Sequence, residues 1–100
     1  MIVKIYKSTR QVVALCDSHL LDKIFQEENS QRQLDMTTTF FKGEEKSNEE
    51  IKEILQNAKI EDATFNIVGE QSCHLAKELG VIDDNSIIKI CNIPVALVFL

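Results

Sequence analysis

Residues 63–80 read Ala-Thr-Phe-Asn-Ile-Val-Gly-Glu-Gln-Ser-Cys-His-Leu-Ala-Lys-Glu-Leu-Gly, and this stretch decides the fold. Thr64 to Val68 are mostly β-branched or aromatic, which predicts a buried strand. From Glu70 onward the apolar residues recur at helical spacing, and Gly80 predicts where that helix ends. Gly69 stands at the change, where a residue without Cβ lets the backbone turn tightly. The stretch therefore predicts a strand, a tight turn and a helix in direct succession.

The residues before this stretch predict a β-hairpin and then a helix. Ile2 to Lys7 and Gln11 to Cys16 are rich in Val and Ile and flank a polar segment, which is typical of a hairpin. Asp17 or Ser18 is expected to cap a helix that ends near residues 28–30. The apolar stripe of this helix consists of Leu20, Leu21, Ile24 and Phe25.

The middle of the chain predicts a strand and a well-capped helix. Residues 33–41 favour a strand because Thr and Phe are frequent there. Ser47-Asn48-Glu49-Glu50 is a capping box, in which the Ser47 hydroxyl and the Glu50 carboxylate each accept a backbone N–H. The apolar positions of the helix that follows are Ile51, Ile54, Leu55 and Ala58.

Two apolar strands are expected at the C-terminus, over Ser86 to Cys91 and Val95 to Leu100. Asn92-Ile93-Pro94 is expected to connect them, with Pro94 at a position where it removes no hydrogen bond of the sheet. The last strand does not alternate between apolar and polar residues. It is therefore expected either to be covered on both faces or to form a contact between copies of the chain.

Together these elements predict an α+β fold. We expect a two-layer sandwich in which a mostly antiparallel or mixed sheet of five to six strands packs against three helices. The passage from Ala63 to Cys91 fits one right-handed parallel crossover. One hundred residues suffice for a single globular domain over 1–100.

Composition excludes several classes of protein. With 44% hydrophobic and 27% charged residues, the chain is expected to be globular. No apolar run is long enough to cross a bilayer, and Lys4 and Lys7 interrupt any signal peptide, so no membrane contact and a cytoplasmic location are expected. Three cysteines without export signals predict reduced thiols.

The charge is unevenly distributed along the chain. The formal net charge is −5, but residues 1–42 hold six Lys and Arg against five Asp and Glu. Lys4, Lys7 and Arg10 gather on the first hairpin beside Tyr6, so these four residues are the candidate contact for an anion or RNA. Solvated surface charges are the favoured alternative.

Asn66, Gly69, Glu70 and His74 are the candidate contacts for a partner or ligand. A free helix N-terminus attracts anions, but Glu70 places a carboxylate there and the glycine patterns of phosphate loops are missing. Asn66 and Glu70 are instead predicted to form a polar pair that either supports the turn or meets a partner. We favour the supporting role.

The cysteines and histidines do not predict a metal site. Cys16 and His19 have a Cys-x-x-His spacing, but adjacent residues such as Cys73 and His74 diverge on a helix, and Cys91 stands alone. Cys73 near a helix start is a possible nucleophile, yet it is expected on the core side without a convergent base. We therefore predict no metal, no cofactor and no catalytic residue.

The chain resembles the archaeal family called "domain of unknown function 424" over nearly its full length. The resemblance rests on Cys16-Asp17, Phe40-Phe41-Lys42-Gly43, Asn66-Ile67-Val68-Gly69-Glu70, Gly80 and Pro94-Val95-Ala96. Position 41 departs from a Phe-Tyr-x-Gly pattern, so no role can depend on a tyrosine hydroxyl there. The resemblance implies an archaeal origin and a compact α+β fold, and it implies no activity.

The sequence therefore favours a non-enzymatic interaction module, associated with translation or an RNA-protein assembly. A protein partner is expected, RNA is a second candidate partner, and the C-terminal strand is a candidate contact for a homo-oligomer. The alternative is a small enzyme or ligand-binding protein with a pocket near Asn66, Glu70 and His74.

Overall fold

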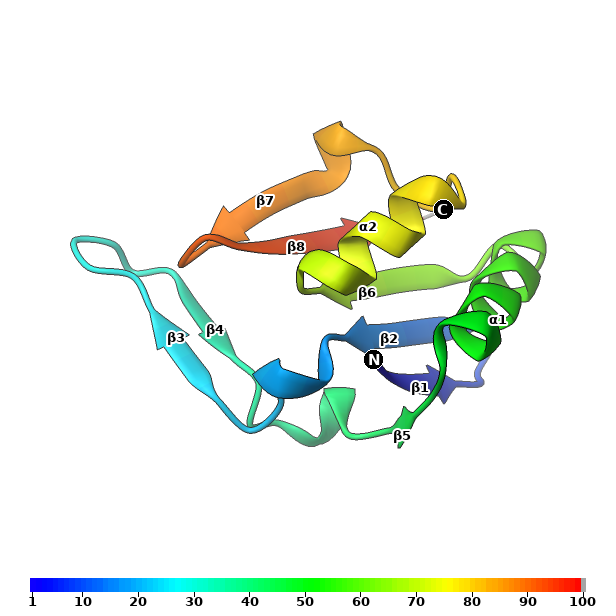
Figure 1. Ribbon diagram of the computed structural model, residues 1–100, viewed down its shortest axis with the longest axis horizontal. Coiled ribbons are helices and arrows are strands. Elements are labelled where there is room, and N and C mark those ends of the chain that lie inside the picture. The colour runs from blue at the N-terminus through cyan, green and yellow to red at the C-terminus, as the bar shows by residue number, and fades with distance from the viewer. Residues whose placement is uncertain (100) are drawn as a thin grey trace.

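The computed structural model of the protein describes residues 1–99, and these residues contain one six-stranded sheet and two α-helices (Figure 1). The strands of the sheet are β1 (Ile2–Tyr6), β2 (Val12–Cys16), β5 (Glu44–Glu45), β6 (Thr64–Val68), β7 (Ile87–Ile90) and β8 (Ile93–Val98). The α-helices are α1 (Asn48–Ile60) and α2 (Glu70–Glu78). A separate antiparallel hairpin consists of β3 (Ile24–Gln26) and β4 (Gln33–Asp35).

The sheet is mixed, with the strand order β5-β1-β2-β6-β8-β7. β2 and β6 are parallel, and every other neighbouring pair is antiparallel. The predicted α+β class, the first hairpin and a mixed sheet of five to six strands are confirmed, although β5 takes the place in this sheet that was expected for residues 33–41. The prediction of three helices is wrong for residues 1–99, since only two α-helices form. The two-layer sandwich stays a prediction.

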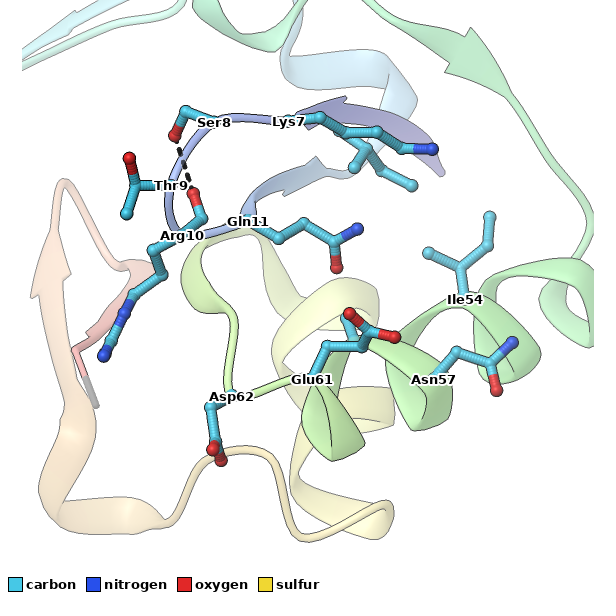
Figure 2. Close-up of a pocket in the computed structure, with 11 residues that line it drawn as sticks. Lys7, Ser8, Thr9, Arg10, Gln11, Ile54, Asn57, Glu61 and Asp62 are labelled. Carbon is cyan, nitrogen blue, oxygen red and sulfur yellow. Dashed lines mark hydrogen bonds between the residues drawn. The ribbon is translucent and has the colours of Figure 1, made fainter.

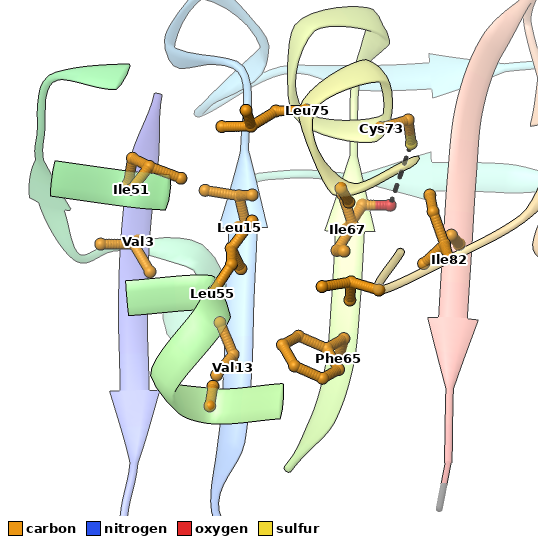
Figure 3. Packing of buried hydrophobic residues seen from close by; sticks show 14 of the residues in the cluster. Val3, Val13, Leu15, Ile51, Leu55, Phe65, Ile67, Cys73, Leu75 and Ile82 are labelled. Carbon is orange, nitrogen blue, oxygen red and sulfur yellow. Dashed lines mark hydrogen bonds between the residues drawn. The ribbon is translucent and has the colours of Figure 1, made fainter. Parts of the chain in front are cut away.

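Both α-helices contribute to one apolar core on the same face of the sheet (Figure 3). Alternate residues of a strand point to one face, and here Val13, Leu15, Phe65 and Ile67 point toward the helices. The buried residues from the helices are Ile51, Leu55 and Ala58 of α1 and Cys73, Leu75 and Ala76 of α2. This core fixes α2 beside β6 and β8.

The predicted ends of the two helices are confirmed. Ser47 Oγ accepts the Glu50 N–H at 3.2 Å, and Glu50 Oε1 accepts the Ser47 N–H at 3.1 Å, which forms the capping box. At the end of α2, Gly80 has φ of 72° and the Val81 N–H donates to the Ala76 carbonyl at 2.9 Å. This is the hydrogen bond of a Schellman motif, which closes the helix.

The predicted helix after Asp17 is wrong. Ser18–Leu20 forms one 3₁₀ turn, Asp22 then adopts φ of 66°, and β3 follows. The apolar residues serve a hairpin instead of a helix face, since Phe25 pairs with Leu34 across β3 and β4. The strand predicted over residues 33–41 is confirmed only for β4, because residues 39–41 form another 3₁₀ turn.

Residues 18–43, which we call the arm, cover part of the sheet face opposite the helices. Leu20, Leu34 and Met36 of the arm are buried in a second apolar cluster. The sheet contributes Cys16, Val68 and Val95 to this cluster. The arm therefore covers this face where β2 and β6 end and β8 begins.

The predicted connection of the C-terminal strands is corrected. Cys91 and Asn92 have φ of 52° and 63°, so they form the two-residue turn, and Pro94 lies within β8. The Gly69 N–H donates to the Pro94 carbonyl, whereas the Gly69 carbonyl accepts from the Cys73 N–H of α2. The missing N–H of Pro94 therefore costs no hydrogen bond of the sheet. The last predicted strand residue, Leu100, lies outside the described residues.

Candidate functional site

The carboxyl ends of β2 and β6 meet at one place. Parallel neighbours end at the same edge of a sheet, which is where ligands of α/β proteins commonly bind. Asp17 follows β2, Gly69 follows β6, and the Asp17 N–H donates to the Val68 carbonyl at 3.0 Å. The start of α2 therefore lies beside Asp17.

The Asp17 carboxylate caps α2 from outside the helix. It accepts the N–H groups of Gln71 at 3.1 Å and Ser72 at 2.8 Å, and the Ser72 hydroxyl at 2.7 Å. Its side chain is 2% exposed, so these donors and the positive helix end stabilise a buried charge. The predicted role of Asp17 as the cap of the next helix is thus wrong. An external phosphate would have to displace this carboxylate.

Gly69 is required by the position of Asp17. Its φ of 113° is rarely adopted by residues with a side chain, and a Cβ added there would lie 2.3 Å from Asp17 Cγ. We call Asp17, Gly69 and the first turn of α2 the junction. Gly69 therefore has a structural role in the junction, since a side chain there would collide with Asp17.

The structure separates Asn66 from the other two polar candidates. Asn66 pairs with Ala14 and Leu97 and points away from the helices, because Phe65 and Ile67 point toward them. Glu70 and His74 lie on the exposed side of α2 and border a hollow of about 390 Å³. The His74 Nε2 lies 2.9 Å from Glu78 Oε1. Within residues 1–99, no hydrogen bond joins Asn66 and Glu70.

The four hairpin residues proposed to contact RNA are divided between two places. The Tyr6 ring stacks on Phe40 with centroids 5.3 Å apart, and its hydroxyl donates to the Phe40 carbonyl at 2.8 Å. The Lys4 Nζ lies 5.7 Å from the centroid of the same ring. Lys7 and Arg10 instead border a hollow of about 640 Å³ beside the end of α1 (Figure 2). Tyr6 thus already packs on an aromatic ring.

The thiols show no sign of activation. Burial, followed by the charge of Asp17, raises the pKa of Cys16 and of Cys73 to about 11. Cys73 Sγ donates to the Pro94 carbonyl at 3.6 Å. Both thiols are thus protonated at neutral pH, which argues against Cys73 as a nucleophile. Residues 1–99 contain no group of three or more side chains that could hold a metal.

One part of the sheet carries exposed apolar side chains. Ile88 pairs with Val95, so it shares a face with Val95 and Leu97, opposite the helices. Ile88 and Leu97 are each 54% exposed, and Phe99 directly after β8 is 75% exposed. We call the area around Ile88, Leu97 and Asn66 the open face. In the sequence, the open face was indicated only by the last strand, in which apolar and polar residues do not alternate.

A family model described as "protein of unknown function (DUF424)" matches residues 6–100. The chain belongs to the DUF424 family. A solved structure of an uncharacterized conserved protein from Methanopyrus kandleri matches with a TM-score of 0.81 and 21% identity. The match covers 97% of this chain and 88% of the other, and at this identity it shows a shared fold alone. No curated protein matches the sequence.

The residues that carry the DUF424 resemblance largely hold the fold together. Asp17 and Gly69 form the junction, and Gly80 ends α2. At Gly43, a Cβ would lie 2.0 Å from the Val3 carbonyl oxygen, so the chain passes β1 too closely for a side chain. Asp17 and these three glycines therefore have structural roles, and a functional surface must use other residues. Among residues 1–99, no helix has the length and apolar character needed to cross a bilayer.

Proposed function

We propose that this DUF424 protein is a non-enzymatic interaction module that binds a protein partner through the open face. The observation that carries the proposal is the exposure of Ile88 and Leu97 at diagonally neighbouring positions on one sheet face. Burial of large apolar side chains stabilises a complex, and neighbouring exposed ones are typical of an interaction surface. Asn66 lies beside Leu97 and adds a polar group to the same surface.

The chemistry of the other candidate groups supports a binding role over catalysis. Asp17 is used by the cap of α2, and the Cys73 thiol is buried and protonated. A small enzyme or ligand-binding protein that uses the hollow at Glu70 and His74 is the second candidate, because those two side chains share that hollow. A cytoplasmic location and an association with translation or RNA remain predictions.

Paired substitutions test the open face. We expect an Ile88→Ser, Leu97→Ser double variant to lose the proteins that wild type retains during affinity purification from the source organism. The matched control is Ile60→Ser, since Ile60 is 81% exposed on α1 and lies off the open face. A partner set that is unchanged in the double variant would overturn the proposal.

A second measurement decides whether the partner is another copy of the chain. Light scattering of the purified protein gives its mass in solution. A dimer that the double variant converts to a monomer would assign the open face to self-association through the C-terminal hairpin. Retention of a defined partner by a monomeric wild type would assign it to a different protein.

A further inference from the structure

A hollow of about 640 Å³ lies between the tip of the first hairpin and the end of α1. One wall is the segment 7–11, and the other consists of the last turn of α1 and residues 61–62. Figure 2 shows the Gln11 amide and the Glu61 carboxylate pointing into the space between the walls. We call this space the hairpin hollow. It is separate from the open face.

Opposite charges border the hairpin hollow. Lys7 and Arg10 lie on the hairpin wall, and Glu61 and Asp62 lie on the helix wall. Within residues 1–99, neither the Lys7 nor the Glu61 side chain has an ion pair or a hydrogen bond. Glu61 is also the C-cap of α1, where a carboxylate is unfavourable because that end of the helix dipole is negative. Helix stability therefore does not explain Glu61.

Hydrogen bonds to backbone carbonyls hold both walls in place. The Thr64 N–H donates to the Gln11 carbonyl at 2.9 Å, which ties the hairpin wall to β6. The Glu61 N–H donates to the Asn57 carbonyl at 3.2 Å, and the Ser8 hydroxyl donates to the Arg10 carbonyl at 2.8 Å. A site that is formed before binding loses less entropy when a ligand enters.

The lining specifies the chemistry of a ligand. Glu61 suits an ammonium group and Lys7 suits a carboxylate. The Gln11 and Asn57 amides can hydrogen bond to either group, and Ile54 offers apolar contact. Nucleic acid fits poorly, because its phosphates would approach the carboxylates of the helix wall. We infer that the hairpin hollow binds a small zwitterion of the free amino acid type.

Nuclear magnetic resonance titration tests this inference. Each of the standard L-amino acids is added to ¹⁵N-labelled protein up to about 5 mM, which detects millimolar affinity. We expect at least one to shift the amide signals of residues 7–11 and 57–62 with a saturable curve. Its N-acetyl and carboxamide derivatives each lack one charge, so each should bind at least about 10-fold more weakly. Absence of any saturable shift, or equal binding of the derivatives, would overturn the inference.

Two variants assign the binding to the hollow. Glu61→Gln and Lys7→Gln should each weaken the amino acid about 10-fold. Glu53→Gln is the matched control, because Glu53 is exposed on the same helix but does not border the hollow. The Ile88→Ser, Leu97→Ser variant should bind the amino acid as wild type does, so the two proposals fail separately. Unchanged affinity in Glu61→Gln, with its circular dichroism intact, would contradict the assignment.

Discussion

The Asp17 carboxylate joins two segments that are far apart in the sequence. Buried hydrogen bonds to a charged acceptor are stronger than neutral ones, and this acceptor also lies at the positive end of α2. We expect Asp17→Asn to lower the free energy of unfolding by about 2 kcal/mol, because an amide keeps only one acceptor oxygen and no charge. Urea denaturation measures the change. Asp22→Asn is the control, since Asp22 is exposed and Asn tolerates its positive φ.

Gly69 provides an independent check of the same contact. Gly69→Ala should lower the free energy of unfolding by about 3 kcal/mol, because the new Cβ would clash with Asp17 Cγ and alanine rarely adopts the φ of this position. Gly80→Ala has a positive φ but less crowding and should cost about 1 kcal/mol. If Asp17 causes the clash, Gly69→Ala should cost less in an Asp17→Ala background. If the effects of Gly69→Ala and Asp17→Ala on the free energy of unfolding simply added, the proposed clash between the new Cβ and Asp17 would be contradicted.

The raised thiol pKa values make a prediction about reactivity. In the folded protein, Cys16 and Cys73 should resist iodoacetamide at pH 8, whereas the partly exposed Cys91 should react. Mass spectrometry should find one label on native protein and three on unfolded protein. Rapid native labelling of Cys73 would contradict the buried, protonated thiol.

The same thiols make stability depend on alkaline pH. Unfolded thiols lose their protons near pH 9, whereas the two buried thiols keep theirs until about pH 11. The unfolded chain therefore binds fewer protons in this range. The contribution of these two thiols to the free energy of unfolding is therefore fully present below pH 9 and is lost as the pH rises through 11.

At the scale of elements, sequence reasoning succeeded where signals are local. The capping box at Ser47 and the change from strand to helix at Gly69 involve neighbouring residues, and both were predicted. The predicted helix after Asp17 does not form, because the Asp17 carboxylate accepts hydrogen bonds from Gln71 and Ser72, more than fifty positions away. Periodicity also cannot show that Phe25 faces Leu34 across a hairpin.

The candidate site was predictable only in part for the same reason. Glu70 and His74 are one helical turn apart, so their shared hollow follows from local spacing. Asn66 belongs to the other face, which depends on the register of β6. The exposure of Ile88 and Leu97 depends on how far the arm reaches across the sheet. No pattern in the sequence fixes that reach.

The capping box leads to a prediction for α1. Ser47→Ala removes the acceptor of the Glu50 N–H and should lower the free energy of unfolding by about 1 kcal/mol. Hydrogen bonds from the Ser47 backbone and hydroxyl lower the pKa of Glu50, so the carboxylate contributes above its unfolded pKa and less as the pH falls through its folded value. Urea denaturation at pH 7 and pH 3 should show a smaller effect of Ser47→Ala at pH 3. An equal effect at both pH values would contradict the hydrogen bond that the Ser47 hydroxyl donates to the Glu50 carboxylate.

At the scale of the whole molecule, two apolar clusters share one set of strands. Leu15 and Ile67 face the helices, while Cys16 and Val68 of the same strands face the arm. Both clusters therefore bury side chains of β2 and β6, so loss of either cluster removes buried apolar area from the same two strands. The helices and the arm should therefore unfold together, as expected for a small two-state protein.

Two optical signals can test this coupling because each reports on one face. Tyr6 is the single tyrosine, there is no tryptophan, and Tyr6 stacks on Phe40 of the arm, so its fluorescence follows the arm. Circular dichroism at 222 nm follows α1 and α2. We expect both signals to give one urea midpoint in wild type.

Core substitutions on either face should shift the two midpoints equally. Met36→Ala in the arm and Leu55→Ala in α1 each leave a cavity at a fully buried position. Each should lower the free energy of unfolding by about 2–4 kcal/mol, whether it is measured by tyrosine fluorescence or by circular dichroism. Ile24→Ser is the control within the arm, since Ile24 is 57% exposed and should cost about 0.5 kcal/mol or less. If Met36→Ala lowered the urea midpoint of tyrosine fluorescence alone, the arm would be a separate unit that docks on a sheet already stable without it. The open face would then extend beneath the arm, because the arm covers Cys16, Val68 and Val95 on that side of the sheet.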